Sequence, residues 1–266
     1  MDAFPVLLKY MSSIYSPHNL SCFFYVLFRV SAFVIIAPFF GDTVIPKKIK
    51  GIFVFMLSAY ISPLLSIPKE LELYAYTSAV VSALLQQILI GLIIGLICKG
   101  FFETLRMAGQ NISNAIQLAF AQMIEPGSGS QSSVISNILD TIGKMYFLTS
   151  LGLLFLIGIF VNSFYDMPIS ADFLSNKSYF DICCWIGKIF SIGMMLSIPS
   201  VGVALLVNAA MAIVTRSAPS INIFSVGFPL VIISGVIALI QITPYLLQRF
   251  LVSSEYYFQI IHNIGL

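Results

Sequence analysis

Long apolar runs separated by short polar breaks organise the chain. A helix needs about 20 residues to cross the hydrocarbon core of a bilayer. The pattern therefore predicts an all-α, polytopic membrane protein of about six apolar helical segments. These runs cover residues 20–40, 51–67, 73–98, 134–165, 189–215 and 217–248. Proline disrupts helices, so several segments are predicted to be broken or re-entrant, at Pro63, Pro199, Pro219 and Pro229.

The pattern predicts one helical domain over residues 1–266. Residues 1–19 form a lead-in, and residues 249–266 form a mildly amphipathic tail. The lead-in lacks a small-residue cleavage site after an apolar core, so it is not predicted to be a cleaved signal peptide. We expect the first apolar segment to insert directly.

The most polar part of the middle of the chain is residues 101–133, which we interpret as a polar helix followed by a loop. After Glu125 the sequence turns to proline, glycine and serine, which end a helix. At membrane depth such a break is tolerated only where protein or water surrounds it. It therefore fits the lining of a passage, and it also fits a solvated loop between two membrane helices.

Several polar side chains lie inside the apolar runs. Arg29 costs a few kcal/mol at mid-depth, so it is expected either to face a partner inside the protein or to extend to the interface. The adjacent amides of Gln86 and Gln87 need hydrogen-bond partners. Asp140 and Lys144 are four residues apart, a spacing at which they can pair on one helix face.

Two further patterns concern helix packing and topology. Gly91 and Gly95 form a small-xxx-small pair, which allows two helix backbones to approach closely. The stretch 45–50 (IPKKIK) is the densest basic loop, and the positive-inside rule places it in the cytoplasm. The charges of the remaining loops alternate consistently and put both termini outside.

Composition supports the membrane class and narrows the chemistry. The 266 residues are 59% hydrophobic and 9% charged, against about 25% charged in soluble domains. A scattered net charge of +2 does not suggest nucleic acid. Neither the four cysteines nor the two histidines have metal-ligand or nucleophile–base spacing, so we expect no enzyme activity, metal or cofactor. A solute transporter remains an alternative on the polar central helix alone, since no internal repeat is evident.

A set of stretches carries a family resemblance through its order and spacing. These are Arg29 with 37–38, Gly41 with 45–50, 86–91 with Gly95, Glu103 with 106–109, 120–127 and 216–230. Together they resemble the FliR family of flagellar export-apparatus proteins, whose counterparts in virulence secretion systems are called SctT. The residues at 127–131 and 222–230 are more similar to those of the flagellar branch of the family. The virulence type remains the alternative.

The resemblance implies a subunit of the core export gate of a type III secretion system, in the bacterial inner membrane at the flagellar basal body. In this family the subunit joins FliP-like and FliQ-like partners in a channel for unfolded axial proteins. FlhB-like and FlhA-like proteins dock on its cytoplasmic side. Family members look like a fusion of one FliP-like and one FliQ-like unit.

The resemblance also implies that the loop at 118–127 acts as a plug that narrows the pore. The positions that match this plug are Phe120, Met123 and Gly127, with Glu125 and Pro126 shaping the turn. Phenylalanine and methionine are bulky and deformable, and a hydrophobic constriction excludes ions by dewetting. This chain departs from the family pattern at Met123, where a phenylalanine is expected.

The remaining polar residues of the apolar segments are predicted to hold helices or subunits together rather than to touch substrate. They are Arg29, Gln86, Gln87, Glu103, Arg106, Asn208 and Arg216.

Overall fold

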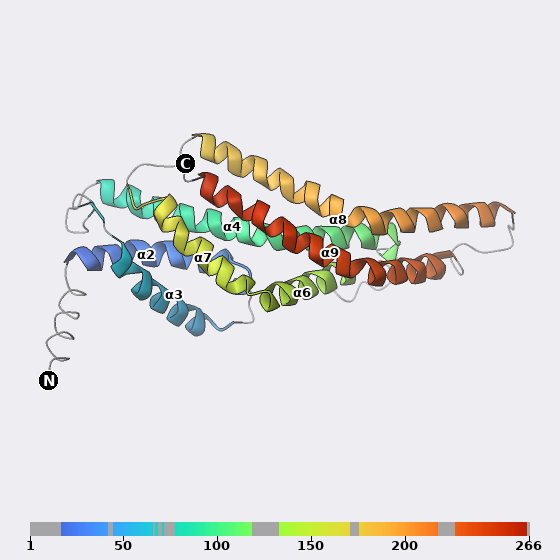
Figure 1. The fold of residues 1–266 in the computed structure, drawn as a ribbon, viewed down its shortest axis with the longest axis horizontal. Coiled ribbons are helices and arrows are strands. Elements are labelled where there is room, and N and C mark those ends of the chain that lie inside the picture. The colour runs from blue at the N-terminus through green and yellow to red at the C-terminus, as the bar shows by residue number, and fades with distance from the viewer. Residues whose placement is uncertain are drawn as a thin grey trace. The chain divides into compact units, whose positions relative to one another are not determined.

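The computed structural model describes residues 17–41, 45–65, 67–68, 71, 78–118, 133–170, 176–217 and 227–264. Within these ranges the chain is helical and has no strand, so the predicted all-α class is confirmed. The elements are α2 (Pro17–Ile36), α3 (Lys47–Ile61), the 3-10 turn η1 (Ser62–Leu64), α4 (Ser78–Ala115), α6 (Val134–Thr149), α7 (Gly152–Asp166), α8 (Asn176–Ser217) and α9 (Phe228–Ile264) (Figure 1).

The number of membrane-spanning segments is slightly lower than predicted. Among the described residues, four helical stretches are long and apolar enough to cross a bilayer: His18–Ile36, Ser78–Ala115, Lys177–Ser217 and Pro229–Ser254. The broken pair α6 and α7 raises the count to five if it crosses as one span. The predicted segment at 51–67 accounts for the difference, because its helix, α3, has only 15 residues.

The helix breaks agree with the sequence at some positions and differ at others. Pro63 lies in η1, directly after the end of α3, and Pro229 is the second residue of α9. Pro199 lies inside α8, so the break predicted there is wrong. Neighbouring helices can compensate the backbone groups that such a proline leaves unpaired. An unpredicted break separates α6 from α7 at Leu151, whose φ of 60° is incompatible with a continuing helix. Pro219 lies outside the described residues.

The chain forms two compact units. Unit 1 comprises Met1–Lys99, Leu154–Ile182 and Phe258–Leu266, and unit 2 comprises Gly100–Leu153 and Cys183–Tyr257. The helices α4, α8 and α9 are therefore each divided between the two units.

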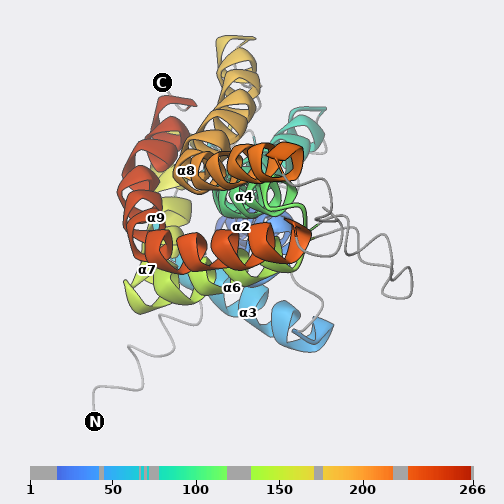
Figure 2. The ribbon, with the colours of Figure 1, turned by 90° about the vertical axis from the view of Figure 1, so that its right-hand side faces the viewer.

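In unit 1, α2 packs against α3 and against the first part of α4 (Figures 1 and 2). A Cβ at Gly91 would lie 2.4 Å from the backbone oxygen of Arg29, and one at Gly95 would lie 3.2 Å from that of Phe33. The small-xxx-small pair thus lies at a close crossing of two helices. The aromatic ring of Phe33 also stacks on Phe160 of α7, with 4.4 Å between ring centroids.

In unit 2, an aromatic cluster joins three helices. Phe101 of α4 stacks on Phe250 of α9, with ring centroids 4.1 Å apart, and Phe102 meets Phe147 of α6 edge-on at 5.2 Å. The second part of α4 also approaches α6 closely, because a Cβ at Gly109 would lie 2.6 Å from the Cα of Ser136. These contacts fix the helices that carry most of the predicted polar residues.

Candidate functional site

Arg29 is fully buried in α2 of unit 1 and is held there by oxygen atoms. Its Nη2 donates to the backbone oxygen of Ser163 at 2.7 Å, and its Nη1 donates to that of Met167 at 2.9 Å. The Nη1 atom also donates to Oε1 of Gln87 at 3.4 Å. Of the two interpretations open from the sequence, the structure shows the buried arginine with partners.

The end of α7 explains how unit 1 accommodates this charge. Carbonyl groups in the last turn of a helix carry partial negative charge and need donors. The guanidinium of Arg29 supplies such donors at the end of α7, and the ring of Phe164 covers it at 4.3 Å. Gln87 is also fully buried, and Gln86 is 5% exposed beside it on α4. The pattern of apolar runs could not have indicated that backbone carbonyl groups receive this charge.

A four-residue ion network lies in unit 2. Nη2 of Arg106 pairs with Oδ2 of Asp140 at 2.9 Å, and Nη1 pairs with Oε1 of Glu103 at 3.1 Å. Nζ of Lys144 binds the same oxygen of Asp140 at 2.9 Å, as the spacing of these two residues predicts. The charges balance, and the side chains of Arg106 and Glu103 are 41% and 36% exposed. The network therefore reaches the surface of unit 2.

An amide of α4 holds the beginning of α6. Oε1 of Gln110 accepts hydrogen bonds from the backbone nitrogen of Ser133 at 3.4 Å and from Oγ of Ser136 at 3.3 Å. The side chain of Ser133 in turn caps α6 by accepting from the backbone nitrogen of Ser136. A serine directly before an apolar helical run is a recognised start signal, so this cap was detectable in the sequence.

A pair of amides holds the end of α4. Nε2 of Gln117 donates to Oδ1 of Asn208 at 3.1 Å, and Nδ2 of Asn208 donates to the backbone oxygen of Ala115 at 3.2 Å. Gln117 itself has a φ of 63°, which ends the regular helix at this point. Asn208 of α8 thus satisfies one of the carbonyl groups that the end of α4 leaves without a helical partner.

The other predicted site residues are not gathered at these networks. Arg216 lies exposed in the last turn of α8, where a cation stabilises the helix dipole. The predicted plug residues Phe120, Met123, Glu125, Pro126 and Gly127 lie outside the described part of the chain.

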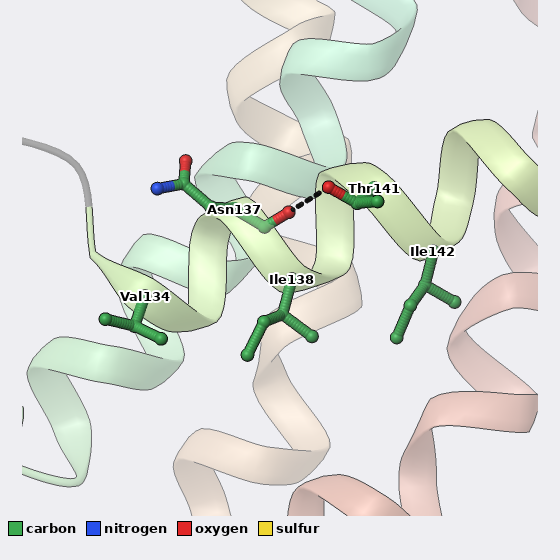
Figure 3. A pocket seen from close by; sticks show the side chains of 5 residues that line it. All are labelled: Val134, Asn137, Ile138, Thr141 and Ile142. Carbon is green, nitrogen blue, oxygen red and sulfur yellow. Dashed lines mark hydrogen bonds between the residues drawn. The ribbon is translucent and has the colours of Figure 1, made fainter.

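The surface of α6 carries a pocket of about 350 Å³. The described residues that line it are Val134, Asn137, Ile138, Thr141 and Ile142. Figure 3 shows the three aliphatic side chains along one side of the helix, while the Thr141 hydroxyl donates to the backbone oxygen of Asn137 at 2.8 Å. Within the described residues no group of three or more His, Cys, Asp or Glu side chains could hold a metal. Several of the polar contacts described above join one helix to another: those of Arg29, Gln110 and Asn208, and the Arg106–Asp140 pair.

The fold and these contacts define a polytopic α-helical membrane protein whose intramembrane polar groups hold its helices together. Residues 20–255 match the family described as bacterial export proteins, family 1. The chain belongs to this family, and it is similar over most of its length to proteins named flagellar biosynthetic protein FliR.

The similarity extends over most of the chain. It is 35% identical over 221 residues to the FliR protein of Buchnera aphidicola subsp. Schizaphis graminum, covering 83% of this chain and 84% of the relative. It is 30% identical over 225 residues to that of Escherichia coli, covering 85% of each, and 30% identical over 221 residues to that of Bacillus subtilis, covering 82% and 84%. The predicted resemblance is confirmed, and the chain is a membrane-embedded component of the flagellar export apparatus.

Proposed function

We propose that this chain is a non-enzymatic subunit of the core export gate in the bacterial inner membrane. With FliP-like and FliQ-like subunits it forms the channel through which unfolded axial proteins leave the cytoplasm. FlhB-like and FlhA-like proteins dock on the cytoplasmic side of this channel. Residues 118–127 act as the plug that seals the pore between transport events.

The observation that carries the proposal is the position of the two amide contacts of unit 2. Gln117 and Asn208 hold the end of α4 immediately before the proposed plug, and Gln110 holds the start of α6 after it. Hydrogen bonds between helices hold membrane segments in place, at about 0.6 kcal/mol each on average. The plug therefore extends from two supported helix ends, which suits a segment that yields to a polypeptide and then closes again.

Removal of residues 119–125 tests the plug. We expect cells with this deletion to leak ions across the membrane, while the chain still co-purifies with FliP-like and FliQ-like proteins. Ion leakage is measured together with secretion of axial proteins, and Ser128→Ala with Ser130→Ala is the matched control in the same loop. No leak and normal secretion would make the segment an ordinary connection, whereas loss of co-purification would contradict the proposed channel partnership.

Two sets of substitutions examine the remaining parts of the proposal. Met123→Phe restores the family pattern, so we expect an ion leak equal to or lower than that of the natural chain.

A non-enzymatic subunit also retains secretion of axial proteins when possible nucleophiles are replaced separately by alanine. These nucleophiles are Ser128, Ser130, Cys183 and Cys184.

A further inference from the structure

The helix α3 corresponds to the shortest of the predicted apolar segments, 51–67. Its 15 residues extend about 22 Å at 1.5 Å per residue, and the 3-10 turn η1 that follows directly adds about 6 Å, so this helical stretch ends just short of a hydrocarbon core of about 30 Å. Its charges are confined to its first turn, at Lys47, Lys48 and Lys50, and no acidic residue accompanies them there. From Gly51 to Ile61 the helix carries no charge.

The two sides of α3 have different surroundings. Ser58 and Ile61 are buried, and Phe53 stacks on Phe40 of the same unit with 4.6 Å between ring centroids. On the side away from Ser58 and Ile61, large apolar side chains recur four residues apart, which places them on one stripe of the helix. Ile52 is 60% exposed, Met56 67% and Tyr60 72%.

We propose that α3 docks on the anionic surface of the lipid bilayer. The ammonium groups of Lys47 and Lys48, both exposed, bind the phosphates of anionic phospholipid headgroups. The stripe of Ile52, Met56 and Tyr60 packs against the adjoining acyl chains. The segment that the sequence suggests as a sixth span is, on this proposal, a surface anchor of unit 1.

Charge complementarity identifies lipid as the occupant of this face. The lysines of α3 lie at one end of the helix and the apolar stripe follows them, so α3 offers its cationic end to lipid headgroups and its stripe to acyl chains. Each lysine near an anionic membrane surface contributes about 1 kcal/mol, which is about fivefold in binding. Lys47 and Lys48, both exposed, also repel the positive end of the helix dipole, and lipid phosphates offset this repulsion.

Quenching of tryptophan fluorescence by brominated lipids tests the docking. The full chain, co-expressed with the export-apparatus proteins of its organism, is reconstituted into vesicles of phosphatidylcholine and phosphatidylglycerol, with bromine on one lipid at a time. The natural chain has a single tryptophan, Trp185, which is only 3% exposed and supplies the background signal. Met56→Trp adds a reporter on the exposed stripe, where the larger side chain does not disturb the packed side.

We expect both brominated lipids to quench the fluorescence of the added tryptophan. Brominated phosphatidylglycerol should quench it more strongly than brominated phosphatidylcholine, and the ratio of the two measures the preference for anionic lipid. Lys47→Gln with Lys48→Gln should lower this preference at least about fivefold, whereas Lys177→Gln, an exposed control outside α3, should leave it unchanged. The variants alter exposed side chains only, and the Trp185 signal reports whether the fold is intact.

Two results would overturn the proposal. Absence of quenching at position 56, or a preference that the two lysine substitutions leave unchanged, would show that anionic lipid is not the occupant. Quenching in the chain reconstituted by itself that disappears in the assembled apparatus would assign the stripe to a protein partner. Neither result depends on the plug, because the ion-leak measurement reports on residues 119–125.

Discussion

Arg29 of unit 1 and Arg106 of unit 2 both lie in apolar helices, yet the two units accommodate them differently. Arg29 is fully buried and donates to neutral oxygens, two of them backbone carbonyls of the α7 end. Arg106 is 41% exposed and pairs with two carboxylates. The carboxylate of Asp166, at the end of α7, also attracts the Arg29 guanidinium, so the two arginines differ in their burial and in the backbone carbonyl groups that receive Arg29.

The difference separates two roles for intramembrane charge. The Arg29 contacts hold α2, α4 and the end of α7 together around a fully buried side chain, so they serve the stability of unit 1. The Arg106 network satisfies its charges internally and still reaches the surface, so it is accessible to water or to another subunit. Substitutions at the two arginines should therefore differ in size and in their response to salt.

The largest expected effect is the loss of Arg29. Arg29→Met keeps the side-chain volume but leaves Gln87 and the carbonyl groups of Ser163 and Met167 without this donor. Hydrogen bonds to charged groups are worth about 1.5–3 kcal/mol each, so we expect a loss of about 3 kcal/mol in the free energy of unfolding. Denaturant unfolding of the full chain in detergent micelles measures it. Arg106→Met is the matched control, expected to lose about 1 kcal/mol; equal losses would remove the distinction.

A smaller effect is expected from the glycine that lies against the backbone of Arg29. Gly91→Ala places a Cβ 2.4 Å from that backbone oxygen, so α2 and α4 must separate. Overpacking of this kind costs about 1–3 kcal/mol. Gly158→Ala, where the added Cβ would have no neighbour within 4 Å beyond its own stretch of helix, should instead gain up to about 1 kcal/mol of helix propensity. The same unfolding measurement compares them, and a stabilised Gly91→Ala variant would show that the close crossing is not required.

The smallest effect is expected in unit 2. A double-mutant cycle of Arg106→Gln and Asp140→Asn should give a coupling energy of about 0.5–1 kcal/mol, because Arg106 is half exposed. Raising the salt concentration from 0.1 to 1 M shortens the screening length from about 10 to 3 Å, so the coupling should weaken. A coupling that is insensitive to salt in the assembled apparatus would place the network in a dry interface between subunits.

Particular residues show what the sequence could predict. The spacing of Asp140 and Lys144 implies their ion pair, since contacts within one helix follow from its period. The same spacing says nothing of Arg106, which lies 34 residues before Asp140 and meets it only because α4 and α6 pack together. The break at Leu151 was not predicted, because residues 145–165 contain neither proline nor a charge and leucine has no turn preference.

The sequence by itself determined the membrane class, the helical content, the family and the residues that need polar partners. Each of these follows from local composition or from the order of motifs. Apolar runs predict helices with partnered polar groups because a bilayer supplies no hydrogen bonds to the backbone or to polar side chains. The tertiary structure decided which partner each polar group receives, that α3 stops short of a span and that α8 continues through Pro199. Those outcomes depend on how closely the helices approach one another. That distance is set jointly by residues that lie far apart in the chain.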